Sequence, residues 1–295
     1  MEIRQLKTFI SIVKLGNFSQ AAHFLGYTQS TVTTHIQLLE KEFNTALFER
    51  FGHQLMLTTD GERLYLYAEQ ILNLADCTKN ELENTGIPHG PIIIGIPESI
   101  CMYRLSDLVR EYALLYPAVE LKLKLGTGSD FRALLRKNMM DIAFFLDKKK
   151  PEADLISRFL WEEEIVMVAS PAHPLVKLKQ VTAKDLRDET LLFTDSGSTY
   201  QLALKEYLMR VASKPRSIWE IGQIHMVKQF VESNLGVTIL PFLAVKPEVE
   251  AGELAILPWR ETELSTNAYL VHHKEKWISS AIQAFIRLVQ ERMMK

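Results

Sequence analysis

Residues 28–42, TQSTVTTHIQLLEKE, combine four threonines and one serine with helical periodicity. Such residues form helices poorly, because they lose rotamer freedom or compete for backbone hydrogen bonds. At about 100° per residue, an apolar stripe is formed by Val32, Ile36, Leu39 and Phe43. A polar stripe is formed by Gln29, Ser30, Thr33, Thr34, Gln37 and Lys41. Short neutral donors and acceptors near a helix N-terminus suit base edges and phosphates in a DNA major groove. The alternative is a polar helix face that binds nothing, although such faces usually carry Glu and Lys.

A second group of polar residues follows short apolar runs in the second half of the chain. These segments are residues 97–100 (PESI), 126–129 (GTGS), 194–199 (TDSGST) and 222–225 (GQIH). In open α/β folds, ligands bind at the carboxyl ends of strands, near helix N-termini whose N–H groups favour anions. We therefore expect a site for a small anion or carboxylate, held largely by neutral donors. Glu98 would repel an anion unless it points away or pairs with Arg104.

Motifs of the common enzyme classes are missing from the sequence. It has no Gly-x-Gly-x-x-Gly, no phosphate loop with Lys-Ser/Thr, no Gly-x-Ser-x-Gly and no His-Glu-x-x-His. His272 and His273 could ligate a metal, but a solvated pair is the better interpretation without a carboxylate at helical spacing. Cys77 and Cys101 lack the CxxC spacing of metal or redox sites. We predict no enzymatic activity, no catalytic residue, no metal site and no cofactor.

The polar stripe needs neighbouring helices to position it. Apolar residues repeat at helical spacing from Leu6 to Val13, and residues 16–17 (GN) favour a helix end. Ser19 is the predicted cap of a short helix that reaches residue 25. With a turn at residues 26–27 and Thr28 as the next cap, the pattern predicts helix, tight turn, helix.

Residues 44–84 predict a small β-wing and then a long helix. Arg50 lies at the base of the wing, where a cation would face phosphates or the minor groove. Thr59 and Glu62 form a possible capping box at the start of the helix. An apolar stripe continues for longer than a small domain needs, through Leu64, Tyr67, Ile71 and Leu74. This stripe predicts that the helix pairs with a second copy.

Length and composition fit two globular domains. The chain has 295 residues, 47% of them hydrophobic, and a net charge of −2. Residues 86–91 (GIPHGP) separate the helical half from a half in which short apolar runs alternate with amphipathic segments, as in open α/β folds. No apolar run approaches the ~18 residues of a membrane span, and no signal segment is present, so we expect a cytoplasmic protein.

Residues 18–61, FSQAAHFLGYTQSTVTTHIQLLEKEFNTALFERFGHQLMLTTDG, resemble the winged helix-turn-helix of LysR-type transcriptional regulators. The features that carry the resemblance are Ala21-Ala22, Gln29, Leu39-Glu40, Leu47-Phe48-Glu49-Arg50 and Leu57-Thr58-x-x-Gly61. The chain departs from the family at Ser30, often Pro there, at Thr34, often Arg, and at Asn44, often Gly. Residues 230–241 (FVESNLGVTILP) are similar to a late segment of the family, with Asn234 in place of its first Gly.

The resemblance implies the fold class and the site residues. The expected fold is an all-α winged helix-turn-helix domain with a long linker helix, followed by an α/β two-lobed sensor domain resembling periplasmic binding proteins. The boundaries would be 1–58, 59–86 and 87–295, with lobe I at about 91–163 and 267–295 and lobe II at about 164–266. The expected DNA contacts are Gln29, Ser30, Thr31, Thr33, Thr34, Gln37, Arg50 and His53. The expected effector contacts are Ser99, Ile100, Thr127, Phe145, Thr194, Ser196, Gln223 and His225.

The function implied by the resemblance is promoter binding modulated by a small-molecule effector. Its partners would be double-stranded DNA, the effector, further copies in a homodimer or homotetramer, and RNA polymerase, with no membrane. Charges up to residue 58 are nearly balanced, so joined copies would gain the DNA affinity that one domain lacks. The alternative is a cytoplasmic small-molecule binding protein of a transport or metabolic system, which would not need a helix-turn-helix.

Overall fold

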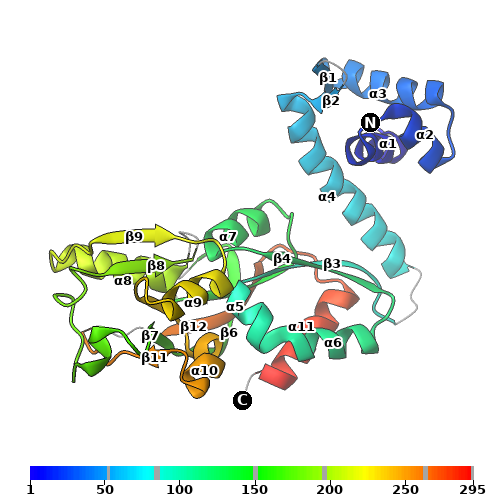
Figure 1. Cartoon of the computed structure of the whole chain (residues 1–295). Coiled ribbons are helices and arrows are strands. Elements are labelled where there is room, and N and C mark those ends of the chain that lie inside the picture. The colour runs from blue at the N-terminus through cyan, green and yellow to red at the C-terminus, as the bar shows by residue number, and fades with distance from the viewer. Residues whose placement is uncertain (52–53, 83–86, 149–151, 195–197, 262–264, 294–295) are drawn as a thin grey trace. The chain divides into compact units, whose positions relative to one another are not determined.

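The computed structural model describes residues 1–51, 54–82, 87–148, 152–194, 198–261 and 265–293. The chain divides into two compact units, Met1–Gly86 and Ile87–Lys295 (Figure 1). Each unit has a hydrophobic core of its own, so each is described separately. No helix in the described ranges is long and apolar enough to cross a membrane.

The N-terminal unit consists of helices and a two-stranded wing. Its elements are α1 (Ile3–Leu15), α2 (Phe18–Leu25), α3 (Gln29–Phe43), β1 (Phe48–Phe51), β2 (Gln54–Leu57) and α4 (Thr59–Leu82). The core is formed by the apolar stripes of α1 and α3, with Leu6 and Phe9 against Val32 and Leu39. Helices α1 and α2 both contact α3, which leaves the polar face of α3 toward solvent.

Two of the predicted helix caps are wrong by one or two residues. Asn17, not Ser19, caps α2, and its Oδ1 accepts hydrogen bonds from the N–H groups of residues 19 and 20 at 2.7 and 3.3 Å. Thr58, not Thr59, caps α4, and its Oγ1 accepts from the N–H of Gly61 at 3.0 Å. Both corrections replace one cap-forming residue with another nearby, so the helices themselves are as predicted.

The apolar stripe of α4 divides between two faces of the helix. Ala68 is buried, and Leu64 and Ile71 pack against the core of the same unit. Tyr67 and Leu74, seven residues apart and therefore on one face, are 63% and 58% exposed. Part of the stripe thus completes the unit's own core, and Tyr67 and Leu74 remain available for contacts with another copy.

The second unit begins with an α/β lobe, here called lobe I. Its strands are β3 (Gly90–Ile96), β4 (Val119–Leu125), β5 (Ile142–Asp147), β6 (Leu155–Glu163) and β12 (Thr266–His273), in the order β4-β3-β5-β12-β6. Strand β3 pairs in parallel with β4 and β5, whereas β12 is antiparallel to β5 and β6. One face packs against α6 (Ser106–Leu115) and α11 (Ser280–Met293), and the other against α7 (Gly128–Arg136). The short α5 (Glu98–Ile100) and the π-helical η1 (Cys101–Leu105) lead into α6.

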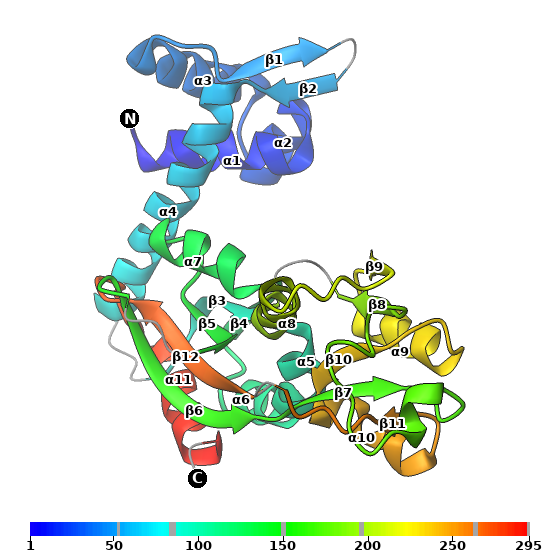
Figure 2. The same ribbon diagram turned by 90° about the vertical axis from the view of Figure 1, so that its left-hand side faces the viewer.

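Lobe II is inserted between β6 and β12. Its strands are β7 (Ile165–Ala169), β8 (Thr190–Phe193), β9 (Ser217–Glu220), β10 (Thr238–Pro241) and β11 (Ala255–Ile256), in the orders β10-β7-β11 and β8-β9. A bridge between Leu191 and Val237 joins the two sets of strands. The helices are the short η2 (Pro174–Lys177), α8 (Thr199–Arg210), α9 (Ile224–Glu232) and α10 (Phe242–Ala251). In Figure 2, β6 of lobe I runs directly into β7 of lobe II.

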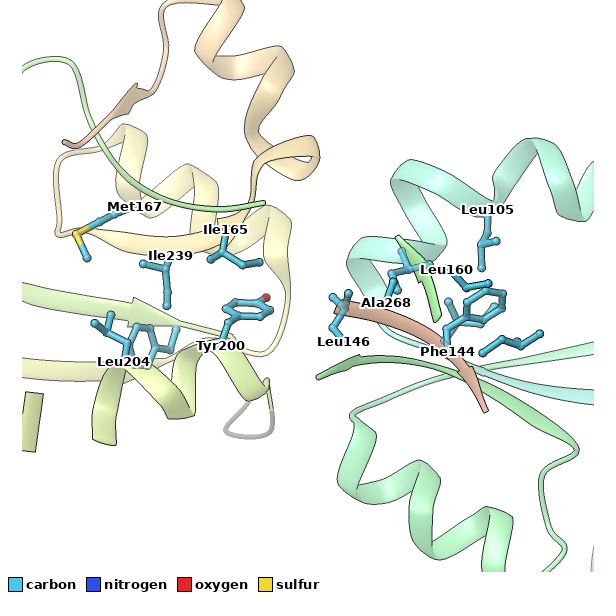
Figure 3. Close-up of a cluster of buried hydrophobic side chains, with 14 of the residues drawn as sticks. Leu105, Phe144, Leu146, Leu160, Ile165, Met167, Tyr200, Leu204, Ile239 and Ala268 are labelled. Carbon is cyan, nitrogen blue, oxygen red and sulfur yellow. The ribbon is translucent and has the colours of Figure 1, made fainter. Parts of the chain in front are cut away.

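Each lobe has tightly packed apolar side chains. In lobe II, Figure 3 shows a group formed by Ile165, Met167, Tyr200, Leu204 and Ile239. In lobe I it shows Leu105, Phe144, Leu160 and Ala268 around the sheet. The architecture confirms the predicted fold class, a winged helix-turn-helix with a long helix followed by a two-lobed α/β domain.

Candidate functional site

The polar face of α3 is the first candidate site. Its exposed side chains are Gln29, Ser30, Thr34 and Gln37, and its partly exposed ones are Thr31 and Thr33. The predicted apolar stripe is buried except for Phe43, which is 44% exposed because α3 ends at this residue. The helix therefore presents a continuous row of short uncharged side chains to solvent.

Hydrogen bonds within α3 explain why the helix tolerates these threonines. Thr33 Oγ1 donates to the carbonyl of Gln29 at 2.9 Å, and Thr34 Oγ1 donates to the carbonyl of Ser30 at 2.9 Å. These bonds, four residues back along the helix, satisfy the hydroxyl donors without breaking the helix. Thr33 and Thr34 therefore offer their oxygen lone pairs and methyl groups, rather than hydroxyl hydrogens, to a ligand.

The start of α3 is fixed by side-chain hydrogen bonds. Thr28 is the cap, as predicted, because its Oγ1 accepts from the N–H of Thr31 at 3.2 Å. Ser19 Oγ on α2 donates to Gln29 Oε1 at 3.0 Å. Since the carbonyl end of the Gln29 amide is held by α2, its NH₂ end is the part that can reach a base edge.

The wing adjoins this helix in the sequence. Arg50 belongs to β1, where its backbone pairs with Leu55 of β2. The Arg50 side chain and the whole of His53 lie outside the residues that the structure describes. Their expected roles in DNA binding therefore stay predictions.

The second candidate site is a cavity of about 310 Å³ in the C-terminal unit. Lobe I contributes residues 97–99, 125–128 and Leu146, and lobe II contributes Thr194, residues 198–200 and residues 222–224. These segments are ends of strands β3, β4, β5 and β8 and starts of helices α5, α7, α8 and α9. The cavity thus lies between the two lobes, where open α/β folds bind ligands.

The structure brings four of the predicted effector residues together in the cavity wall: Ser99, Thr127, Thr194 and Gln223. Ser196 is among residues 195–197, which fall outside the described part of the chain. The wall also contains further members of the four candidate segments, Pro97, Gly126, Gly128, Ser198, Thr199, Gly222 and Ile224, and three residues outside them, Leu125, Leu146 and Tyr200. These three residues lie at the end of β4, near the end of β5 and at the start of α8, so the junction of a strand end and a helix start would have identified them too.

Three predicted effector residues lie outside this wall. Ile100 is buried in the core of lobe I, and His225 is on the exposed face of α9 beside Gln229. Phe145 is also buried and stacks on Phe131 of α7, with ring centroids 6.4 Å apart. These residues belong to segments that reach the cavity, but their own side chains do not line it.

Four hydroxyl groups of the wall donate to acceptors inside the protein. Thr127 Oγ1 donates to Asp130 at 2.6 Å as part of the cap of α7. Thr194 Oγ1 and Ser198 Oγ donate to Gln201 Oε1 at 3.0 and 2.6 Å. Thr199 Oγ1, from lobe II, donates to the carbonyl of Leu146 in lobe I. We expected the hydroxyls of Thr127 and Thr194 to donate to an anion, but in the structure their hydrogens are bonded within the protein.

Glu98 is part of the cavity wall and bonds across it. Its Oε2 accepts from the N–H of Ile224, the first residue of α9, at 3.3 Å. The partner considered for it, Arg104, bonds instead to Glu163 at 2.9 and 3.3 Å and lies over the Trp161 ring. The Glu98 carboxylate therefore occupies the positive end of the α9 dipole, where an anionic ligand would otherwise bind.

Cys101 lies one turn beyond this carboxylate and is a free thiol. Burial raises the pKa of Cys101, and the charge of Glu98 raises it further. A raised pKa lowers the thiolate fraction, and the thiolate is the form that reacts with oxidants. This environment does not favour redox sensing.

Family models match both units of the chain. Residues 3–62 match the model described as the bacterial regulatory helix-turn-helix protein of the lysR family. Residues 85–294 match the model described as the LysR substrate binding domain. The matches cover the wing and polar helix in one case and both lobes in the other.

Relatives with similar sequences carry the same description over their whole length. An uncharacterized HTH-type transcriptional regulator of Bacillus subtilis, YwqM, is 36% identical over 292 residues, which cover 99% of each chain. The HTH-type transcriptional activator CmpR of Synechocystis is 28% identical over 96% of this chain and 93% of its own.

Solved structures of full-length regulators share the fold. The structure of full-length CbnR complexed with its target DNA has a TM-score of 0.71 at 20% identity, covering 99% of each chain. A full-length OxyR from Pseudomonas aeruginosa has a TM-score of 0.70 at 21% identity, covering 99% of this chain and 94% of its own. With both units matched by family models and a relative matched along its full length, the chain belongs to the LysR family of bacterial helix-turn-helix transcriptional regulators.

Proposed function

We propose that this regulator binds promoter DNA through the polar face of α3, and that a small molecule in the cavity between the lobes changes this binding. The observation that carries the proposal is the joint presence, in one chain, of an exposed uncharged helix face and a cavity lined by both lobes. Closure of the lobes around a ligand would favour one of two arrangements and so alter affinity for DNA. The proposed setting is the cytoplasm, with RNA polymerase as a further partner and no enzymatic step.

The α3 face is suited to reading bases because it combines donors with acceptors. The NH₂ group of Gln29 can donate to base acceptors, while Thr33 and Thr34 can accept from exocyclic amines and contact thymine methyl groups. A protein of the same fold, full-length CbnR, has been solved in complex with its target DNA, which supports DNA binding by this chain. Cations outside α3, with Arg50 as the leading candidate, would contact phosphates and contribute affinity for any sequence.

Gln29→Ala should weaken binding to specific DNA by about 1–3 kcal/mol, because it removes a base contact. Binding to unrelated duplexes and thermal stability should hardly change, since the Gln29 side chain is exposed. Fluorescence anisotropy with duplexes selected from a random library measures both affinities. Gln283→Ala, at an exposed position on α11, is the matched control and should leave both unchanged.

Arg50→Ala distinguishes phosphate contacts from base contacts in the same assay. It should weaken binding to selected and unrelated duplexes alike and flatten the dependence on salt. Wild-type affinity for selected duplexes in both Gln29→Ala and Arg50→Ala would exclude this surface as the DNA-binding site.

We also propose that the chain acts as a homodimer or homotetramer assembled partly through α4. The support is the exposed pair Tyr67 and Leu74, which lie on one face of a 24-residue helix. Leu74→Glu should dissociate this contact, because burying an unpaired charge costs far more than the apolar contact contributes. Leu74→Met should preserve it, because the substitution conserves volume and polarity.

Light scattering at micromolar concentration provides the measurement for α4. We expect the wild type and Leu74→Met to share a mass of at least two chains, and Leu74→Glu to fall to a smaller species with unchanged helix content. A monomeric wild type, or a Leu74→Glu variant with the wild-type mass, would contradict the proposed role of α4.

A further inference from the structure

Among the residues that the structure describes, the wall of the cavity between the lobes has an acidic side chain and no basic one. The acidic residue is Glu98, and none of the described wall residues is Lys, Arg or His. The undescribed residues 195–197 are Asp, Ser and Gly, so they cannot supply a positive charge either. Arg132 of α7 is close in sequence to the wall but is held by Asp147 and Glu152.

The buried Lys228 does not pair with the Glu98 carboxylate. Lys228 of α9 bonds to Glu248, to the carbonyl of Ala244 at 3.0 Å and to Tyr103 Oη at 3.2 Å, and it is not part of the wall. The charge of Glu98 also acts on its surroundings. Burial raises the pKa of Tyr200, another wall residue, and the Glu98 charge adds to this effect. The potential in the cavity therefore disfavours additional negative charge.

Four hydroxyl groups of the wall have no hydrogen left to donate to a ligand. The hydroxyls of Thr127, Thr194, Ser198 and Thr199 all donate to protein acceptors, so toward a ligand they can act only as acceptors. The first N–H of α9 is already bonded to Glu98. A ligand that donates hydrogen bonds is matched to this wall, whereas an added carboxylate would meet another carboxylate and several acceptors.

We propose that the effector carries a protonated amine, which pairs with Glu98 and donates to neighbouring hydroxyl oxygens. A charge-assisted hydrogen bond to a carboxylate in a partly enclosed site is among the strongest single contacts available to a small ligand. The volume of about 310 Å³ limits the ligand to a small amine. This inference rests on the proposed sensor function and replaces the small anion that the neutral donors and helix N-termini led us to expect.

A fractionated extract of bacterial small molecules tests the chemical class of the ligand before any single compound has been identified. A strong cation exchanger at low pH retains compounds that contain an amine and passes nitrogen-free carboxylic acids and sugars. The full-length protein is melted with each fraction at increasing concentration, because a ligand that binds the native state raises the Tm. We expect the amine fraction to raise the Tm and the nitrogen-free fraction to leave it unchanged.

Glu98→Gln removes the charge and keeps an amide oxygen that can accept from the N–H of Ile224. The variant should need at least about tenfold more of the amine fraction for the same Tm rise. Glu206→Gln, at an exposed position of α8 outside the wall, removes the same charge from the unit and should respond like the wild type.

The possible outcomes separate this inference from the function on which it rests. Stabilisation by the nitrogen-free fraction, or an undiminished response of Glu98→Gln to the amine fraction, would overturn the amine assignment while leaving a small-molecule sensor in place. The absence of stabilisation by either fraction would count against the sensor function itself, and the amine proposal would fall with it. Loss of the response in both Glu98→Gln and Glu206→Gln would show that net charge, not the cavity, controls binding, and would also overturn the assignment.

Discussion

Gly61→Ala should lower the free energy of unfolding of the N-terminal unit by about 2–3 kcal/mol and greatly reduce DNA binding. A Cβ atom at this position would lie 2.1 Å from the carbonyl oxygen of Leu47 and 3.0 Å from Cδ2 of Leu57. The Leu47 backbone cannot easily move away. Its carbonyl accepts from the N–H of Thr58 at 3.1 Å, and its N–H donates to Glu40 Oε1 at 2.8 Å.

Tryptophan placement allows the two units to be followed separately in one urea titration. All four tryptophans of the chain lie beyond residue 160, so their fluorescence reports on the C-terminal unit, whereas far-UV circular dichroism reports on both. In Gly61→Ala, part of the dichroism signal should be lost at lower urea, with the fluorescence transition unchanged. Gly16→Ala is the control, because a Cβ there meets nothing within 4 Å but φ is +68°, so it should cost only about 1–2 kcal/mol. Equal stability of Gly61→Ala and wild type would disprove the steric account.

The contact between Gly61 and the Leu47 carbonyl also explains why these motif residues occur together. The resemblance to the LysR family depends on Leu39-Glu40, Leu47 and the Leu57-Thr58-x-x-Gly61 ending. In the structure, Glu40 binds the Leu47 N–H, Thr58 binds the Leu47 carbonyl, and Gly61 lets α4 approach that carbonyl. The spacing of apolar residues predicted the helices and the wing, because each kind of element imposes its own period on the residues that face the core. It could not predict which backbone group each motif residue contacts, because those contacts are between segments distant in sequence.

At both sites the sequence predicted where the hydroxyl groups lie but not which atoms they bond to. Helical periodicity placed Thr33 and Thr34 on the exposed face of α3, and strand ends placed Thr127 and Thr194 in the cavity wall. Whether a threonine donates to a ligand or to the protein depends on its rotamer and on acceptors nearby, which a sequence pattern does not contain. In all four cases the hydrogen is used within the protein.

Phe145 illustrates a second limit. Strand β5 is buried on both faces, so it reads as a continuous apolar run with no alternation to show which residue faces which side. Phe144 packs toward α11, Phe145 toward α7, and Leu146 at the strand end reaches the cavity. The end of the strand could be predicted, but the side chain that faces the cavity could not.

Lys228→Met should lower the free energy of unfolding of the C-terminal unit by about 3–5 kcal/mol, the largest effect that we expect. Lys228 is 5% exposed and bonds to Glu248, the Ala244 carbonyl and Tyr103. Removing the ammonium leaves the Glu248 carboxylate half-buried and without its cation. Its Oε2 already has no hydrogen-bond partner among the residues that the structure describes, so the remaining oxygen would join it.

The double variant Lys228→Met with Glu248→Leu separates the loss of an ion pair from the loss of packing. Replacing both partners with apolar side chains leaves no unpaired charge, so the double variant should recover most of the stability that Lys228→Met loses. Tryptophan fluorescence in urea measures both variants, since it reports on this unit. A double variant as unstable as Lys228→Met would mean that Lys228 acts through packing and not through its charge.

The pH dependence of the same measurement provides an independent check on the charge of Lys228. Burial lowers the pKa of Lys228, but hydrogen bonds to Glu248 and Tyr103 outweigh burial, so the pKa is raised overall. A raised folded-state pKa contributes stability that is fully present below the ordinary lysine value and is lost as the pH rises through the folded-state pKa. The stability difference between wild type and Lys228→Met should therefore stay constant from neutral pH to about pH 10 and shrink above it. A difference that already shrinks near pH 8 would show that Lys228 is deprotonated more easily in the folded protein, and that the bonds to Glu248 and Tyr103 do not compensate for its burial.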